Sequence, residues 1–131
     1  MNTPPRILVV DDDKDFQDLL NTKLTSSGFE VQTAVNGKDG VEKAKEIHPA
    51  LILMDVKMPE MDGVAAMLKL KESDETKDIK VILLTAFGDP QPEFYKNDKR
   101  FAQELGAVEY ILKTDDLDTI VTRITASLPK E

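Results

Sequence analysis

The chain has 131 residues, which fits a single domain able to bury about two thirds of its unfolded surface. It contains no cysteine, which excludes disulfides and thiolate metal sites, and its net charge of −8 argues against direct binding to nucleic acid. No apolar run approaches the ~18 residues that span a bilayer, and residues 1–6 lack the apolar core of a secretory signal. We therefore expect a cytoplasmic protein without membrane contact.

Short apolar runs alternate with helical patterns along the chain. Strands are predicted at residues 6–10, 30–34, 50–54, 79–84 and 108–112. Five helices are predicted from apolar residues at helical spacing, which are Phe16, Leu19, Leu20 and Leu24; Val41, Ala44 and Ile47; Val64, Met67 and Leu68; Phe101, Ala102 and Leu105; and Leu117, Ile120, Val121, Ile124 and Leu128. Gly28, Pro49 and Gly106 suit helix ends, and Asn36-Gly37 predicts a turn.

Alternating strands and helices predict an α/β fold, a doubly wound five-stranded parallel sheet with helices on both faces. Because right-handed crossovers leave few topologies, we expect the flavodoxin-like strand order 2-1-3-4-5. The predicted domain covers residues 6–128, between a loose tail at 1–5 and a short C-terminal end at 129–131.

Polar residues follow four of the apolar strands. Asp11 and Asp12 follow the first strand, Asp55 the third, Thr85 the fourth and Lys113 the fifth. The carboxyl ends of parallel strands share one edge of a sheet, so these side chains should lie close together. Clustered carboxylates repel one another, and a hard divalent cation such as Mg²⁺ removes that conflict.

Each of these residues also has a structural explanation when taken alone. Helix capping is the preferred interpretation of Asp13, and for Asp11 and Asp12 it is as good as metal binding. Asp55 could bind metal, act as a base or attack phosphorus. A threonine hydroxyl and a lysine ammonium could both bind phosphoryl oxygens. Only their joint appearance at four strand ends favours phosphoryl chemistry.

Four stretches resemble the receiver domain of response regulators in two-component signalling. They are Ile7–Asp12, Met54–Gly63, Val81–Ala86 and Tyr110–Lys113. The run Asp-x-x-Met-Pro-x-Met-Asp-Gly within the second stretch is highly specific, and the resemblance extends over residues 6–128.

The resemblance implies that Asp55 accepts a phosphoryl group from a histidine kinase or a histidine phosphotransfer protein. It also implies that Mg²⁺ is held by Asp11, Asp12, Asp55 and the backbone carbonyl of Lys57. Such a domain catalyses its own phosphorylation and dephosphorylation, but it is a signalling module rather than an enzyme.

By the same resemblance, Thr85 and Lys113 bind phosphoryl oxygens, and Tyr110 turns inward with Thr85 as a switch. The switch would alter a surface formed by the fourth helix, the fifth strand and the fifth helix, for a downstream protein target that the sequence does not identify. The resemblance also implies that Lys57 and Phe87 flank the path of the hydrolytic water, so we expect them to slow dephosphorylation unless both point into solvent.

Two departures from the family pattern stand out. Thr114 occupies the position of a proline that usually follows the lysine, which predicts a trans Lys113-Thr114 peptide bond. Residues 86–99 form an unusually long segment. His48, the single histidine, is predicted at a helix end far from the acidic edge and has no expected catalytic role.

Two alternatives remain at this point. A haloacid-dehalogenase-like phosphatase using Asp11 would also contain Thr85, Lys113 and an acidic pair such as Asp115-Asp116. It leaves the motif around Asp55 unexplained and needs a further strand before the acidic pair. A receiver-like binding module that is never phosphorylated usually lacks part of the site, whereas this sequence keeps every part.

Overall fold

In the computed structural model, the described residues are 4–56, 61, 63–85, 107–113 and 115–128. Their five strands form one parallel sheet in the order β2-β1-β3-β4-β5, which confirms the predicted fold class and topology. The strands are β1 (Arg6–Val10), β2 (Glu30–Ala34), β3 (Leu51–Asp55), β4 (Lys80–Thr85) and β5 (Glu109–Leu112).

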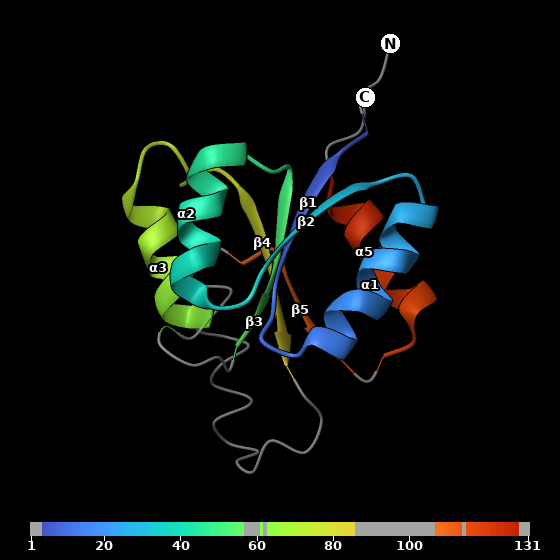
Figure 1. The fold of residues 1–131 in the computed structure, drawn as a ribbon. Coiled ribbons are helices and arrows are strands. Elements are labelled where there is room, and N and C mark those ends of the chain that lie inside the picture. The colour runs from blue at the N-terminus through green and yellow to red at the C-terminus, as the bar shows by residue number, and fades with distance from the viewer. Residues whose placement is uncertain (1–3, 57–60, 62, 86–106, 114, 129–131) are drawn as a thin grey trace.

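Four helices cover the two faces of this sheet within the described residues. They are α1 (Lys14–Ser26), α2 (Gly37–Ile47), α3 (Gly63–Glu72) and α5 (Leu117–Ser127). Helices α1 and α5 pack on one face, and α2 and α3 pack on the other (Figure 1). The predicted fourth helix and the segment 86–99 lie outside the described residues. None of the helices in the described part is long and apolar enough to span a bilayer.

The core has two halves because successive side chains of a strand point to opposite faces of the sheet. Alternate residues of β1, β3 and β4 therefore enter different halves. The half under α1 and α5 contains Ile7, Val9, Leu20, Leu24, Leu51, Leu53, Ile82, Leu84, Ile111, Ile120 and Ile124. The half under α2 and α3 contains Leu8, Val10, Val41, Ala44, Ile52, Met54, Met67, Leu70, Val81 and Leu83.

Local polar contacts set the ends of the helices. Asp13, Asn36 and Asp116 are N-caps, and each side chain accepts a hydrogen bond from the backbone N–H three residues later. The Asn36-Gly37 pair thus begins α2, where the sequence predicted only a turn. At the other end of α2, His48 adopts a left-handed conformation with φ of 48° and closes the helix before Pro49. The helix-end prediction is confirmed there.

Strands β3 and β4 each extend one residue beyond their predicted ends. Asp55 pairs in register with Leu84, and Thr85 pairs with Leu112. The backbone of both residues is therefore fixed by the parallel ladder. This rigid placement brings functional side chains to the carboxyl edge of the sheet.

Candidate functional site

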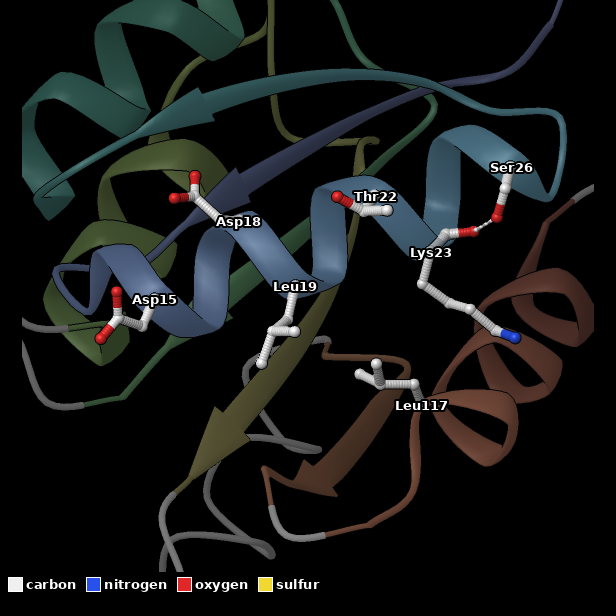
Figure 2. Close-up of a pocket in the computed structure, with 7 residues that line it drawn as sticks. All are labelled: Asp15, Asp18, Leu19, Thr22, Lys23, Ser26 and Leu117. Carbon is white, nitrogen blue, oxygen red and sulfur yellow. Dashed lines mark hydrogen bonds between the residues drawn. The ribbon is translucent and has the colours of Figure 1, made fainter.

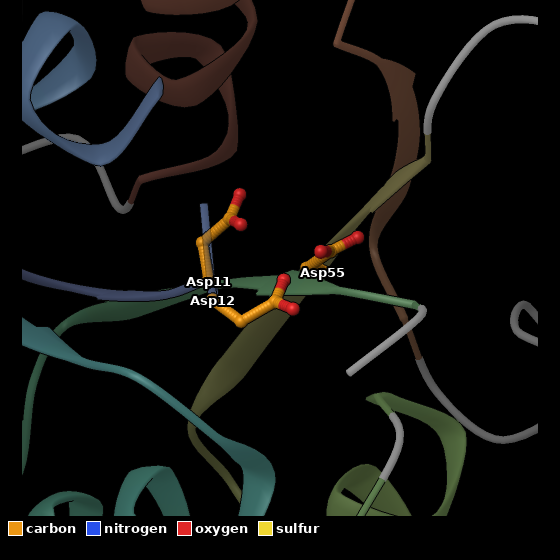
Figure 3. Close-up of side chains that lie close together, drawn as sticks. All are labelled: Asp11, Asp12 and Asp55. Carbon is orange, nitrogen blue, oxygen red and sulfur yellow. The ribbon is translucent and has the colours of Figure 1, made fainter. Parts of the chain in front are cut away.

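Three carboxylates meet at the carboxyl ends of β1 and β3. One oxygen from each of Asp11, Asp12 and Asp55 can be chosen so that all lie within 4.8 Å of one another (Figure 3). Asp11 and Asp55 are buried, while Asp12 is exposed. The structure therefore assembles the acidic cluster expected from the sequence.

The side-chain alternation of the strands explains how Lys113 reaches this cluster. Asp11, Asp55 and Lys113 each lie two residues beyond a side chain of the core half under α1 and α5. Those preceding core residues are Val9, Leu53 and Ile111. A two-residue step returns a side chain to the same face, so all three groups converge on that side of the sheet edge.

Lys113 forms ion pairs with two of the three carboxylates. Its Nζ atom lies 2.7 Å from Asp11 Oδ2 and 3.2 Å from Asp55 Oδ2, and its side chain is only 14% exposed. Burial alone would lower the pKa of Lys113, but the hydrogen bond to Asp11 and the charges of Asp55 and Asp11 outweigh it and raise the pKa. The stabilisation that comes from the charge of Lys113 is therefore complete below the ordinary lysine pKa and is lost as pH rises through the raised one.

Asp11 is fully buried and its two oxygens have different surroundings. Oδ1 accepts a hydrogen bond of 2.8 Å from the backbone N–H of Asp13. Oδ2 lies 2.7 Å from the Lys113 ammonium. Asp11, Asp12 and Asp55 together offer three carboxylate oxygens within 4.8 Å of one another, which fits the hard oxygen-donor set that Mg²⁺ takes.

Gln17 supports the backbone of the site and was missed in the sequence analysis. It is buried on α1, and its Nε2 atom lies 2.8 Å from the carbonyl oxygen of Ala34 and 3.3 Å from that of Asp11. The amide thereby ties the ends of β1 and β2 to α1. A polar residue such as glutamine within a helical pattern is normally expected on the exposed face. Only its position around the helix, relative to the apolar residues, indicates that it is buried.

Thr85 is the last residue of β4 and is 2% exposed. Its carbonyl oxygen accepts a hydrogen bond of 2.8 Å from the backbone N–H of Lys113, which ties the lysine to the neighbouring strand. Tyr110 lies on β5 in register with Leu83, but its side chain is outside the described set.

Four sequence predictions concern residues that the structure does not describe. Lys57 as a carbonyl ligand, Lys57 and Phe87 as rate-tuning residues, and a trans Lys113-Thr114 bond all involve residues outside the described ranges. The same holds for the fourth helix as part of an output surface.

Gly63 shows how closely α3 approaches the end of β3. Its N–H donates to the carbonyl oxygen of Val56, and a Cβ atom at Gly63 would lie 2.3 Å from the carbonyl oxygen of Asp55.

Because the obstacle is backbone, Gly63→Ala should lower the free energy of unfolding by about 1–3 kcal/mol. Urea unfolding measures the free energy of unfolding of the parent and the variant. The exposed α3 variant Lys69→Ala should change it by less than about 0.5 kcal/mol, and an equally small effect of Gly63→Ala would contradict the close approach.

A separate groove lies between α1 and the start of α5 (Figure 2). Leu19 and Leu117 contribute its apolar lining, and Leu19 is 59% exposed. Lys23 extends toward α5 and forms an ion pair with Asp118. None of the lining residues belongs to the acidic cluster.

Sequence and structure comparisons place this arrangement in a family. The model of the response regulator receiver domain matches residues 7–125. The chain belongs to this receiver-domain family. The chemotaxis protein CheY of Treponema pallidum is 42% identical over 128 residues, which cover 95% of this chain and 83% of that protein. A CheY-like response regulator receiver domain protein from Methanospirillum hungatei has a solved structure that is 28% identical, with a TM-score of 0.82 over 95% of this chain and 93% of that one.

Other relatives are longer regulators. The DNA-binding transcriptional regulator RpaA of Synechocystis is 36% identical over 124 residues, which cover 95% of this chain but 49% of RpaA. The chain thus spans about half the length of such regulators. The family assignment confirms a phosphorylatable signal receiver, and the comparisons give no support to the haloacid-dehalogenase-like alternative.

Proposed function

We propose that Asp55 is the phosphoryl acceptor of this receiver domain and that a histidine kinase or histidine phosphotransfer protein is the donor. The observation that carries the proposal is the position of Asp55 at the end of β3, within the acidic cluster and 3.2 Å from the Lys113 ammonium. Asp55 therefore lies beside two carboxylates that could bind a divalent cation with it, and beside an ammonium that could bind phosphoryl oxygens.

The reaction is a transfer between two side chains. An Asp55 oxygen attacks the phosphorus of a phosphohistidine that is protonated at its other ring nitrogen. The P–N bond breaks, its electron pair stays with the ring, and the imidazole leaves as the neutral form. The products are an aspartyl phosphate and a free histidine. Lys113, already paired with Asp55, is within reach of the new phosphoryl oxygens, and the Thr85 hydroxyl supplies a hydrogen-bond donor from the adjacent strand.

The proposed cofactor is Mg²⁺, held by Asp11, Asp12, Asp55 and the backbone carbonyl of Lys57. When bound, the ion neutralises charge on the carboxylates and on the incoming phosphoryl oxygens. The protein contributes the spacing of the carboxylates, which the ladder of β1 and β3 fixes. We therefore propose that the domain catalyses its own phosphorylation and dephosphorylation at this site, as a signalling module rather than an enzyme.

The Asp-x-x-Met-Pro-x-Met-Asp-Gly run that begins at Asp55 favours Asp55 over Asp11 as the nucleophile, because this run carries the likeness to receiver domains. Asp11 contacts the Asp13 N–H through one oxygen and the Lys113 ammonium through the other. The acidic pair that resembles a phosphatase motif has structural roles instead. Asp116 caps α5 by accepting the Thr119 backbone N–H, which lowers the pKa of its carboxyl, and Asp115 lies 3.7 Å from Arg123.

Phosphorylation by a small-molecule donor tests the proposal. The protein is incubated with acetyl phosphate and Mg²⁺, and its intact mass is measured with and without a chelator. We expect an adduct of one phosphoryl group that requires the divalent cation. A protein that remains unmodified at saturating donor and Mg²⁺ would refute the proposed acceptor function.

Thr85 is proposed to couple phosphorylation to the downstream binding surface, together with Tyr110. A local charge change needs a bistable element to reach a distant surface. Thr85→Ala should still accept the phosphoryl group but lose most of the amide shift changes that beryllofluoride causes in residues 101–110. Thr85→Ser keeps the hydroxyl and should retain them. Shift changes in Thr85→Ala that match those of the parent would contradict the coupling.

A further inference from the structure

The aromatic ring of Phe16 lies beside the Lys113 ammonium. Phe16 is in the first turn of α1, and Lys113 Nζ is 4.9 Å from the centroid of its ring. A cation within about 6 Å of an aromatic face is attracted by the negative charge of that face. Among the described residues, the ammonium therefore contacts the carboxylates of Asp11 and Asp55 and the Phe16 ring.

The position of Phe16 is linked to the acidic cluster through the start of α1. Asp13 donates its N–H to Asp11 Oδ1, and its own side chain accepts the N–H of Phe16 at 3.2 Å. Asp11 and Lys113 are then joined by the 2.7 Å ion pair. These contacts form a closed path from the carboxylate through the helix cap and the ring to the ammonium, and back to the carboxylate.

A third contact matters because a lysine side chain is long and flexible. Its ammonium is strongly hydrated, so in open solvent it would sample many positions. Here the side chain is 14% exposed, and an attraction to an aromatic face is stronger where water is displaced. Phe16 also packs against the core half under α1 and α5, so ordinary apolar packing is the competing explanation.

We propose that Phe16 is a positioning residue that holds the Lys113 ammonium at the acidic cluster for phosphoryl transfer. This inference rests on the proposed function of Asp55 and Lys113. On this proposal, the electrostatic attraction between the ring and the ammonium, and not the volume of the ring, speeds phosphorylation of the site.

Nuclear magnetic resonance tests the contact itself, independently of any reaction. The ring current of Phe16 should shift the Lys113 ε-methylene protons upfield relative to those of exposed lysines. Phe16→Tyr should keep this shift, because it keeps the aromatic face. Phe16→Leu, which preserves apolar bulk, should remove it. A Lys113 signal that is the same in the parent and in Phe16→Leu would overturn the contact.

Phosphorylation rates test the role. With acetyl phosphate and saturating Mg²⁺, Phe16→Leu should lower the rate by about three- to tenfold, while Phe16→Tyr should remain within about twofold of the parent. In a Lys113→Met background, Phe16→Leu should cause no further decrease. Urea unfolding of each variant shows whether a rate loss comes from instability.

The outcomes distinguish a failure of the proposed Phe16 role from a failure of the proposed acceptor function. If the parent is phosphorylated and Phe16→Leu reacts as fast, the role of Phe16 is overturned while the acceptor site stands. A decrease that persists unchanged in the Lys113→Met background also overturns it, because the ring would then act through packing. A parent that is never phosphorylated overturns the proposed function, whereas the resonance shift still decides whether the ring contacts Lys113.

Discussion

Asp55→Asn should abolish the phosphoryl adduct that acetyl phosphate and Mg²⁺ produce in the parent. An asparagine amide has nearly the shape of the carboxylate but lacks the anionic oxygen that attacks phosphorus. The substitution should leave the fold intact, because Asp55 is held by the ladder to β4 and Lys113 keeps its 2.7 Å pair with Asp11. Intact mass spectrometry measures the adduct, and we expect no detectable modification.

Asp11→Asn is the matched comparison for this experiment. It makes the same chemical change just after the neighbouring strand β1, within the same acidic cluster. If Asp55 is the acceptor, Asp11→Asn should slow phosphorylation through weaker cation binding and still allow a modified product at high donor concentration. The reverse pattern, with labelling lost in Asp11→Asn and full in Asp55→Asn, would identify Asp11 as the nucleophile and revive the phosphatase alternative.

The fold was predictable from this sequence because its signals are local and repeated. Four of the five strands are short apolar runs, and each connection contains a helical pattern, which together leave few topologies. The end of a strand is less well determined, since a polar residue breaks the apolar run before the ladder stops. For this reason the predicted strands stopped one residue early, whereas β3 includes Asp55 and β4 includes Thr85.

The membership of the acidic cluster was also predictable, because strand ends of a parallel sheet share one edge. The contacts of its members were not. That Lys113 pairs with Asp11 as well as Asp55 depends on the direction that the Asp11 and Lys113 side chains take just past the ends of β1 and β5. Similarly, Phe16 was read as an ordinary apolar position of a helix, and its contact with Lys113 depends on how α1 sits against the sheet edge.

The roles of Gln17 and Gly63 depend on distances that no sequence pattern expresses. Gln17 meets backbone carbonyls of two different strands, and Gly63 leaves space for the carbonyl of Asp55. The glycine was visible within the specific motif around Asp55, but the motif alone gives no physical reason for it. The structure supplies the reason as the close approach of α3 to the end of β3.

Asp12→Ala should weaken Mg²⁺ binding by at least about tenfold. Loss of even an outer partner of a metal ligand typically costs about 10–100-fold in affinity, and Asp12 is proposed as a direct ligand in a site with few protein ligands. The fold should tolerate the change because Asp12 is exposed, and removing one of three close carboxylates relieves repulsion in the metal-free protein. Titration calorimetry measures the affinity directly.

Asp13→Ala is the matched control, since it removes the same charge from the next residue. Asp13 is also exposed, but it caps α1 and is not among the three clustered carboxylates. We expect Asp13→Ala to lower the free energy of unfolding by about 1 kcal/mol and to reduce Mg²⁺ affinity much less than Asp12→Ala does. Because a ligand that binds only the folded state stabilises it, Mg²⁺ should raise the melting temperature of the parent and of Asp13→Ala more than that of Asp12→Ala. Equal losses of affinity in the two variants would mean that general charge, rather than direct ligation by Asp12, determines binding.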